Sequence, residues 1–517
     1  TLTVRFIFNK ISVSDIKETR NGDFIMNFKT VSPEKIGLSS KNVLSFIKTL
    51  ESYNCCTHSI LMARGENIFV EMYYAPFNKD LKHRMYSISK SFVSIAVGMA
   101  ADDGLLSLDD KFLDYFEEYR NENENEFLRE CTIRDLLMME SSMHEGINWF
   151  VSGSDDRSEV YFRKPADKIC GTLFSYDSSG SYMLNVIVEK VTGKPFLEYI
   201  KEKALSELGF SADSYCINAP GGHSFGDSGV MCTARDLLIF ARFVMQKGNY
   251  NGKQYMSREY LETATSKLVD NNSSARTSYG NFGYGYQIWG APDNGFAFVG
   301  MGDQFAICIP DKDFVFIINS DNQGYSPATR TVLYHELYRS IVRCLEDGEL
   351  PEDEASYREL CDHMQNGKLF SLTQGSRNPF EDEINGVTYK LDKNPMNIEY
   401  VRFDFDGNKG KLSYKNFQGE KELFFGMGYN EFGKFPEEGY SDMVTTKFEA
   451  GHYYDCACSA DWCEDKKLRM KVQIIDKYFG NAAFVFSFKD SRVAVEMTKT
   501  AENFLEEYQG IAMGRKF

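Results

Sequence analysis

Residues 87–101 of the chain read Ser-Ile-Ser-Lys-Ser-Phe-Val-Ser-Ile-Ala-Val-Gly-Met-Ala-Ala, and this stretch decides the fold and the chemistry that we expect. Because the residues after Lys90 are apolar on nearly every side, they predict a helix buried in the core. Ser87 and Lys90 are three positions apart and would share one face of that helix. Burial disfavours the charged form of an amine, so Lys90 is a candidate base for a serine nucleophile. The amides that open the helix would point at Ser87, where acyl transfer develops an oxyanion.

The S-x-x-K spacing is by itself a weak signal. Average amino-acid usage gives roughly two such matches by chance in a chain of this length. The same letters begin at Ser14, Ser32 and Ser45, none of which opens a buried helix. Two interpretations of Ser87 therefore stay open: a catalytic nucleophile, or an ordinary N-cap serine of a core helix.

The composition limits the class of protein. A chain of 517 residues is too long for one ordinary core, which predicts two domains. The formal net charge of -17 argues against nucleic acid as a partner. No run approaches the roughly 18 apolar residues of a membrane helix, and the 12 cysteines are scattered rather than set in a disulfide framework. We expect a cytoplasmic protein with no membrane partner; a removed leader stays open because the chain lacks an initiator Met.

The order of the predicted elements indicates an α+β fold. Two strands precede a long series of helices, and four more strands follow it, at residues 59–63, 67–73, 286–289, 296–299, 305–309 and 314–319. This order predicts an antiparallel sheet, flanked by helices, whose early and late strands pair across the helical part of the chain.

Four segments follow from composition and periodicity. They are an N-terminal extension, a helix-flanked domain, an acidic connector with a short helix, and a β-rich domain, at residues 1–30, 31–345, 346–384 and 385–517. In the last segment apolar residues alternate with others, as at Phe484, Phe486 and Phe488, which is typical of half-buried strands. We expect a small antiparallel barrel or sandwich there.

Two further elements are candidates to complete a site around Ser87. Tyr176-Asp177-Ser178 forms a predicted turn before a helix, and a tyrosine hydroxyl near a lysine can share its proton. Residues 300–304, Gly-Met-Gly-Asp-Gln, lie between two apolar strand segments, where glycines let backbone or substrate approach closely. A hairpin turn is the alternative for this second element. The Tyr-x-Ser letters alone carry little weight in a chain with 30 tyrosines.

The ordered set of motifs at residues 86–92, 132–139, 176–178, 193–196 and 300–304 resembles the penicillin-recognising serine hydrolases. Within them it looks most similar to the branch of class C β-lactamases, family VIII carboxylesterases and 6-aminohexanoate-dimer hydrolases. The resemblance covers about residues 31–345 and rests on the motifs in combination. It implies a β-lactamase/transpeptidase-like fold and a serine hydrolase that cleaves an ester or amide bond through an acyl-enzyme.

The resemblance also implies a role for each polar residue. Ser87 would accept the acyl group, Lys90 would take the serine proton, and Tyr176 would act as the acid/base partner. Ser178 stands where a polar residue commonly orients the lysine and the substrate.

The third motif, Gly300-Met301-Gly302, would line the oxyanion hole. By the resemblance, the Ser87 amide would form one half and an amide near Met301 or Asp303 the other, in a register that the sequence leaves open. Lactam-processing members usually carry Lys or His in this motif, and no basic residue occurs in residues 300–304. This departure favours an esterase or amidase. A β-lactamase, a D-amino-acid peptidase and a catalytically inactive binding module stay as alternatives.

Two other patterns invite a second site. Residues 222–226, Gly-His-Ser-Phe-Gly, match the letters of a nucleophile elbow but lack the buried strand before it and the helix after it, so we interpret them as a loop near the pocket. His452, Cys456, Cys458 and Cys463 are close in sequence, yet alternation in a β-domain spreads neighbours over both faces. We therefore expect no metal and no cofactor. The partner that we expect is a small ester, amide or peptide substrate, and the oligomeric state stays open.

Overall fold

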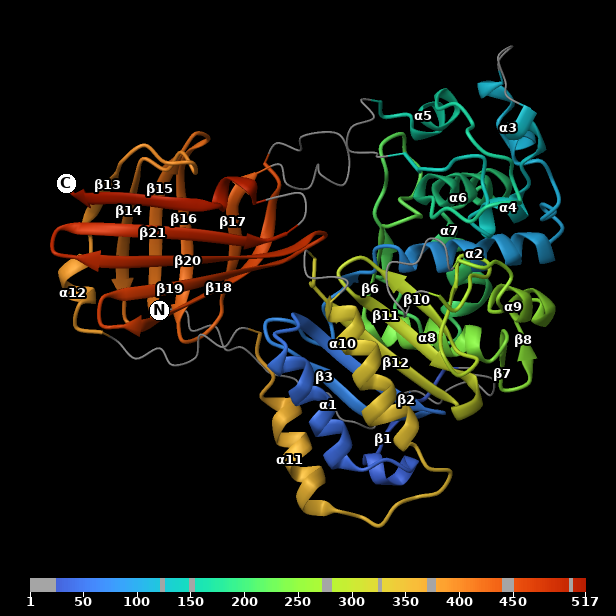
Figure 1. Ribbon diagram of the computed structural model, residues 1–517, viewed down its shortest axis with the longest axis horizontal. Helices are drawn as coiled ribbons and strands as arrows, with labels where there is room; N and C mark the ends of the chain where they lie inside the picture. Colours follow the sequence, from blue (N-terminus) through green and yellow to red (C-terminus); the bar gives the residue numbers. More distant parts are fainter. Residues whose placement is uncertain are drawn as a thin grey trace, which may run out of the picture.

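The computed structural model describes residues 25–120, 126–147, 154–271, 281–323, 328–369, 378–438, 451–501 and 505–517. Two bodies lie side by side in Figure 1: a helix-rich body built from the blue to yellow part of the chain, and a β-barrel built from the orange and red part. This is the predicted α+β architecture with a β-rich C-terminal part. Most of the predicted N-terminal extension, residues 1–30, lies outside the described residues.

A seven-stranded sheet forms the centre of the first body. Its order is β1 (Lys29–Thr30), β3 (Asn67–Tyr73), β2 (Thr57–Arg64), β12 (Phe314–Ser320), β11 (Gln304–Ile309), β10 (Phe296–Gly300) and β9 (Trp289–Gly290). All neighbours are antiparallel except β1 and β3. The early strand β2 pairs with the late strand β12, with Arg64 opposite Phe314 and Thr57 opposite Ser320. The predicted pairing across the helical part of the chain is confirmed.

Alternation along the strands builds two hydrophobic layers. In β2, Ile60 and Met62 belong to the layer that includes α1 (Ser40–Ser52), α10 (Ala328–Glu336) and α11 (Glu354–Gln365). Leu61 and Ala63 belong to the opposite layer, which includes α2 (Ile88–Asp102) and α8 (Ala234–Met245). The sheet is therefore covered by helices on both faces.

The helix that begins after Ser87 is buried as predicted. Residues 88–100 of α2 are all buried, and α2 contacts α6 (Ser178–Thr192) and α7 (Phe196–Ile200). A Cβ atom on Gly98 would lie 2.6 Å from Cε1 of Tyr260, on α9 (Arg258–Ala264). Only a glycine lets this tyrosine ring pack directly on the helix backbone.

Shorter elements complete the first body. They are α3 (Glu126–Glu130), α4 (Ile133–Leu137), α5 (Arg157–Arg163), the pair β7 (Asn249–Tyr250) and β8 (Lys253–Gln254), and a small sheet in the order β4 (His83–Arg84), β6 (Val230–Cys232) and β5 (Tyr215–Cys216). The small sheet matters for function because β4 ends just before Ser87.

The predicted strand at residues 286–289 is wrong for its first part. Only Trp289 and Gly290 form a strand. Gln287 has a left-handed backbone with φ of 57°, and its side-chain amide donates to the carbonyls of Leu136 and Leu137 at 2.8 and 3.1 Å. These bonds tie the segment to the end of α4 instead of extending the sheet.

The second body is a closed β-barrel. Its order is β16 (Gly419–Met427), β15 (Lys409–Asn416), β14 (Tyr400–Asp406), β13 (Thr388–Leu391), β22 (Gly510–Lys516), β21 (Arg492–Thr500), β20 (Phe479–Lys489), β19 (Lys467–Ile475), β18 (Tyr453–Glu464) and β17 (Glu431–Glu438). Pairing of β16 with β18 at Gly426 and Ser459 closes the ring, and β17 pairs with another part of β18. Buried aromatic rings fill the interior, as where Phe403 and Phe486 meet at 4.8 Å between centroids.

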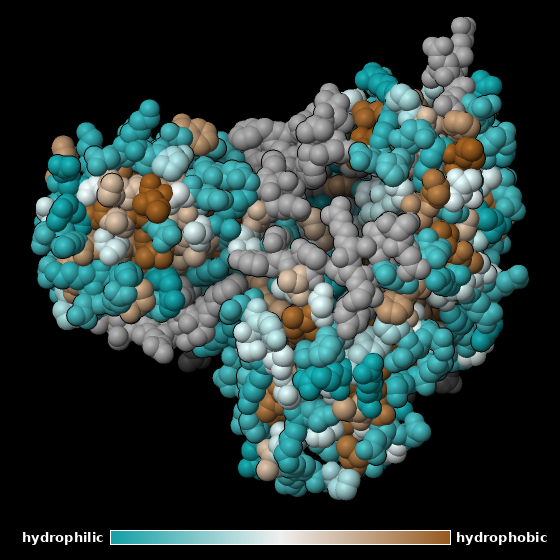
Figure 2. Space-filling view, viewed as in Figure 1, coloured by the Kyte–Doolittle hydropathy of each residue, from teal (hydrophilic) through white to brown (hydrophobic). Residues whose placement is uncertain are grey.

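The cysteines of the predicted cluster at residues 452–463 are divided between the core and the surface of the barrel. Cys456 and Cys458 are buried in the barrel core and Cys463 is exposed. Among the described residues, no three His, Cys, Asp or Glu side chains are grouped to hold a metal ion. Within the same residues, every helix is too short or too polar to span a bilayer. The face seen in Figure 2 is mostly hydrophilic, with scattered hydrophobic residues.

We predict that Gly98→Ala destabilises the protein, although alanine is normally the better helix former. The added methyl group would meet the Tyr260 ring at 2.6 Å, and overpacking of this kind costs about 1–3 kcal/mol of unfolding free energy. Urea unfolding followed by tryptophan fluorescence measures the change. Gly348→Ala is the matched control, because a Cβ at Gly348 has no heavy atom within 4 Å. An unchanged midpoint for Gly98→Ala would contradict the packing argument.

Candidate active site

The candidate nucleophile follows directly on a short strand and a strained turn. β4 pairs with β6, with Arg84 opposite Met231, and the Met85 amide continues this pairing by donating to the Val230 carbonyl at 2.8 Å. Tyr86 then adopts a left-handed backbone with φ of 47°. Such strain persists only where the surrounding structure enforces it, and it is typical of functional sites. The turn directs the chain from β4 into α2 at Ser87.

Ser87 and Lys90 are in direct contact. The Lys90 Nζ atom donates to Ser87 Oγ at 3.0 Å and to the Asp227 carbonyl at 2.6 Å. Lys90 is only 1% exposed, whereas Ser87 is half-buried and open to the surface. The Ser87 side chain makes no capping hydrogen bond to the start of α2. Ser87 thus stands at the N-cap position of α2 without capping the helix, and its hydroxyl contacts the buried amine instead.

Tyr176 lies beside the same lysine. The Lys90 Nζ atom is 5.3 Å from the centre of the Tyr176 ring, and this ring stacks on Trp289 at 5.5 Å. The next residue, Asp177, anchors the segment by capping α6 and by accepting from Ser141 Oγ at 3.0 Å. Ser178 is half-buried and is already the first residue of α6, not part of a preceding turn. Ser178 makes no hydrogen bond to Lys90 in the described part of the chain.

The third motif forms the end of β10 and the turn into β11. A Cβ on Gly300 would lie 2.4 Å from the Met85 carbonyl oxygen, so only glycine lets this strand approach the nucleophile turn. Met301 packs against Tyr86, and Gly302 has φ of 77°. The Gln304 side chain fixes the turn by donating to the carbonyls of Met301 and Ser320. The motif thus combines both interpretations: it is a hairpin turn, and it lies against the segment that carries Ser87.

A group of buried charges surrounds the carbonyl that binds Lys90. Asp227 is 3% exposed; burial raises the pKa of its carboxyl group, and the charges of Lys90 and Arg157 oppose that shift. Arg84 donates to the Ser228 carbonyl at 2.9 Å, and Arg157 lies over the Phe225 ring at 4.2 Å. The loop interpretation of residues 222–226 fits this arrangement, because the loop leads straight to Asp227.

Sequence reasoning did not single out Asp227 or Arg84. Asp227 stands in a glycine-rich run, Gly226-Asp227-Ser228-Gly229, which is the one local signal that could have marked it. Arg84 has no such signal. Its position is explained only by its contacts, since it is 2% exposed and its partners are distant in sequence.

Two buried histidines lie behind the nucleophile turn. His83 Nδ1 contacts the Arg84 carbonyl at 2.9 Å, so this nitrogen carries the proton, and His83 Nε2 accepts from His58 Nδ1 at 2.7 Å. Burial lowers the pKa of both rings, to about 3 for His83, and the neighbouring His83 charge lowers that of His58 further. Both rings are therefore neutral near pH 7 and act as a hydrogen-bonded support beneath β4.

The fold places the chain in the α+β class, and comparison with known proteins gives the family. The model of the beta-lactamase family matches residues 57–337, more than half of the chain, and the chain belongs to this family. This confirms the superfamily that the sequence motifs indicated.

The chain is similar to one curated protein that is named as a hydrolase and to several solved structures. The 6-aminohexanoate-dimer hydrolase of Paenarthrobacter ureafaciens is 27% identical over 243 residues, which are 44% of this chain and 60% of that protein. The chain thus matches less than two thirds of that relative. Among solved structures, a family VIII carboxylesterase has 14% identity and a TM-score of 0.47, covering 60% of this chain and 99% of its own. The octameric penicillin-binding protein homologue from Pyrococcus abyssi has 18% identity and a TM-score of 0.46, covering 92% and 99%.

We predict that the buried histidines make the fold less stable in acid. The pKa of His83 falls from 6.5 to about 3 on folding. Between these values the unfolded chain binds more protons, so the free energy of unfolding declines as the pH falls from 6.5 towards 3. His83→Gln removes this contribution. Its melting temperature should be below that of the wild type at pH 8, and the difference should narrow towards pH 4.

Thermal unfolding between pH 4 and pH 8 provides the measurement. His144→Gln is the control, because the His144 side chain is exposed and the hydrogen bonds of this residue come from its backbone, so its replacement should leave the pH profile unchanged. A His83→Gln profile parallel to that of the wild type would show that His83 does not carry the acid sensitivity.

Proposed function

We propose that the protein is a serine hydrolase that cleaves an ester or amide bond through an acyl-enzyme on Ser87. The observation that carries the proposal is the 3.0 Å contact between Lys90 Nζ and Ser87 Oγ, made by a buried amine at the start of a buried helix. A serine hydroxyl is a weak nucleophile unless a neighbouring base takes its proton. Lys90 is the group in position to do so.

In the first step Lys90 Nζ accepts the Ser87 proton while Oγ attacks the substrate carbonyl carbon. The carbonyl oxygen becomes an oxyanion, which the Ser87 amide and an amide of the turn at residues 301–303 stabilise. Tyr176 delivers a proton to the leaving alcohol or amine and regains one from Lys90, since its ring lies beside the lysine. The leaving group departs and Ser87 carries the acyl group as an ester.

In the second step water hydrolyses this ester. Tyr176 and Lys90 take a proton from the water as its oxygen attacks the acyl carbon, and a proton returns to Ser87 Oγ when the acid product leaves. Every proton is returned within the cycle, and each step uses only side chains and backbone amides of this chain. Catalytic hydrogen bonds commonly tighten only in the substrate complex, which accounts for the ring contact of Tyr176 in the free protein.

The substrate class that we propose is a small acyl ester or a linear amide. The third motif supplies no Lys or His for a lactam carboxylate, since residues 300–304 are Gly-Met-Gly-Asp-Gln. The name of the 6-aminohexanoate-dimer hydrolase that the chain resembles supports an amide substrate. Acyl esters of p-nitrophenol and short linear amides are the compounds to test first.

We predict that a fluorophosphonate probe labels the wild-type protein and that Ser87→Ala abolishes labelling. The probe reacts with an activated serine, and mass spectrometry of the labelled peptide locates it. Ser45→Ala is the matched control: Ser45 is exposed and begins the same S-x-x-K letters within α1, so labelling should persist. Labelling that survives in Ser87→Ala would refute the assignment. A wild-type protein that neither reacts with the probe nor hydrolyses any acyl ester would favour an inactive binding module.

We further predict that Lys90→Met and Tyr176→Phe slow acylation by about 10²–10⁴-fold, the usual contribution of a general acid or base. Both substitutions keep the apolar bulk of the side chain and remove the group that moves the proton. Stopped-flow release of p-nitrophenol measures the acylation rate. Lys48→Met on α1 is the control for Lys90, because its amine pairs with Glu359 at the surface. A Lys90→Met rate within a few fold of the wild type would remove the lysine from the mechanism.

A further inference from the structure

We propose that the C-terminal barrel positions the active site. Tyr478 is the positioning residue, through which the barrel holds the nucleophile turn in place. The proposal rests on the proposed function of Ser87. It concerns the turn between β19 and β20, residues 476–478, which leaves the barrel and reaches the segment just before Ser87.

The first contact is through Arg84. Its guanidinium donates to the Lys477 carbonyl at 3.4 Å, while the same group donates to the Ser228 carbonyl at 2.9 Å and to Ser228 Oγ at 3.2 Å. Ser228 follows Asp227, whose carbonyl accepts from Lys90. One buried arginine therefore joins the barrel turn to the loop that fixes the candidate base.

The second contact is aromatic. The Arg84 guanidinium lies 4.6 Å from the centre of the Tyr86 ring and 5.1 Å from that of Tyr478. The two rings meet edge to face, with centroids 6.1 Å apart and an interplanar angle of 85°. Tyr86 is the residue with the left-handed backbone, and Ser87 follows it. Tyr478 thus packs on Tyr86, the strained residue, and on Arg84, two residues before it.

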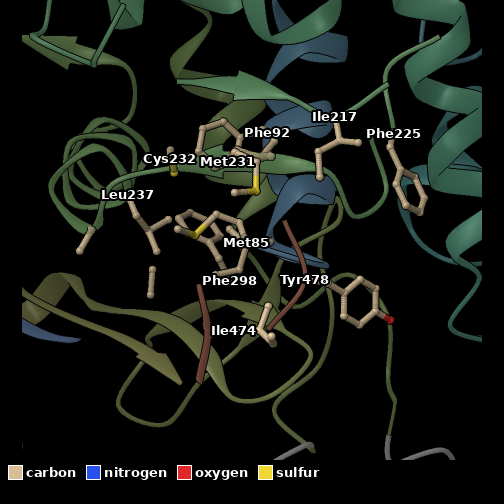
Figure 3. Close-up of a cluster of buried hydrophobic side chains, with 14 of the residues drawn as sticks. Met85, Phe92, Ile217, Phe225, Met231, Cys232, Leu237, Phe298, Ile474 and Tyr478 are labelled. Atoms are coloured by element: carbon tan, nitrogen blue, oxygen red, sulfur yellow. The ribbon is translucent and has the colours of Figure 1, made fainter. Parts of the chain in front are cut away.

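The hydrophobic core is continuous at this place. Met85 belongs to the same buried cluster as Ile474 and Tyr478. Figure 3 shows Ile474 and Tyr478, on the red barrel segments, beside Met85 and Phe298. Met85 is the residue whose carbonyl approaches Gly300. The barrel therefore reaches the side chains of the nucleophile turn.

A polar contact supports the same turn from its other side. Gln323 donates to the Tyr86 hydroxyl at 3.5 Å. Two residues earlier, Asp321 is fully buried; burial raises its pKa to about 7, and the charge of Lys471 on β19 opposes this shift. Lys471 in turn donates to Asn481 of β20. Lys471 of the β19–β20 hairpin thus lies near Asp321, two residues before the glutamine that contacts Tyr86.

These contacts restrain the backbone of Tyr86 as well as joining the two bodies. A tyrosine with a left-handed backbone is strained, and it relaxes when its surroundings allow. If Tyr478 is removed, Tyr86 and Arg84 gain freedom, and Ser87 and Lys90 lose their mutual position. A misplacement of about 1 Å can reduce a rate by a factor of about a hundred. The chemical step should suffer, while the fold of each domain should remain.

The test compares the rate at which the fluorophosphonate probe labels Ser87 in full-length variants. Tyr478→Ala should slow labelling about ten- to a hundredfold, and should lower kcat for a p-nitrophenyl ester more than it raises KM. Tyr478→Phe keeps the ring that packs on Arg84 and Tyr86, and should retain a rate within about threefold of the wild type. Far-ultraviolet circular dichroism and thermal unfolding report the fold of each variant.

Phe488→Ala is the matched control for barrel stability. Phe488 is buried in the barrel core among Phe380, Tyr389 and Phe403, away from Arg84. It should lower the melting temperature as much as Tyr478→Ala does, yet label at the wild-type rate below that temperature.

The outcomes separate this proposal from the proposed function. If the wild type is not labelled at Ser87, the proposed function fails. If the wild type is labelled and Tyr478→Ala is labelled equally fast, the proposed function stands and the role of Tyr478 is overturned. Equal slowing by Tyr478→Ala and Phe488→Ala would also overturn it, because the effect would then follow stability alone.

Discussion

The backbone of Tyr86 is the constraint on which the site depends. A non-glycine residue in the left-handed region is held there only by what surrounds it, and the surroundings come from every part of the first body. β6 fixes the preceding strand, Gly300 lets β10 approach the Met85 carbonyl, and buried α2 begins one residue after Ser87. The hydrogen bond between Lys90 and Ser87 exists because these elements meet at one turn.

The buried charged groups around this turn lie close to groups that compensate them. Three basic side chains, Lys90, Arg84 and Arg157, lie close to the buried carboxyl group of Asp227. An isolated buried charge is costly, so such groups persist only with compensating partners. Backbone carbonyls provide part of that compensation, since those of Asp227 and Ser228 accept from Lys90 and Arg84. The loop at residues 225–229 therefore compensates the buried lysine in two ways: the Asp227 carbonyl accepts its hydrogen bond, and the Asp227 carboxyl group lies close to it.

How much the sequence could predict depends on how local each feature is. The burial of α2 and the Ser87–Lys90 spacing are local and were predictable, and the glycine at residue 300 indicated a close approach without naming its partner. The pairing of β2 with β12 was predictable from element order. Gln287 was mistaken for part of a strand because its side-chain bonds to α4 override the local pattern. Arg84 acts through residues that are far away in the chain, so no motif could reveal it.

The barrel changes how the site must be assembled. Met85 of the nucleophile turn is separated from Tyr478 by about three quarters of the chain, yet the two residues share one buried cluster. A contact between residues so far apart in sequence costs loop-closure entropy when it forms. This cost favours its formation late in folding. The helical spacing of Ser87 and Lys90 is set locally by α2, whereas the proposed role of Tyr478 makes their mutual orientation depend on a contact between the two bodies. On the proposed roles of Ser87 and Tyr478, the reactive geometry is complete only when both bodies are folded and docked, so a partly folded chain would not expose an activated serine.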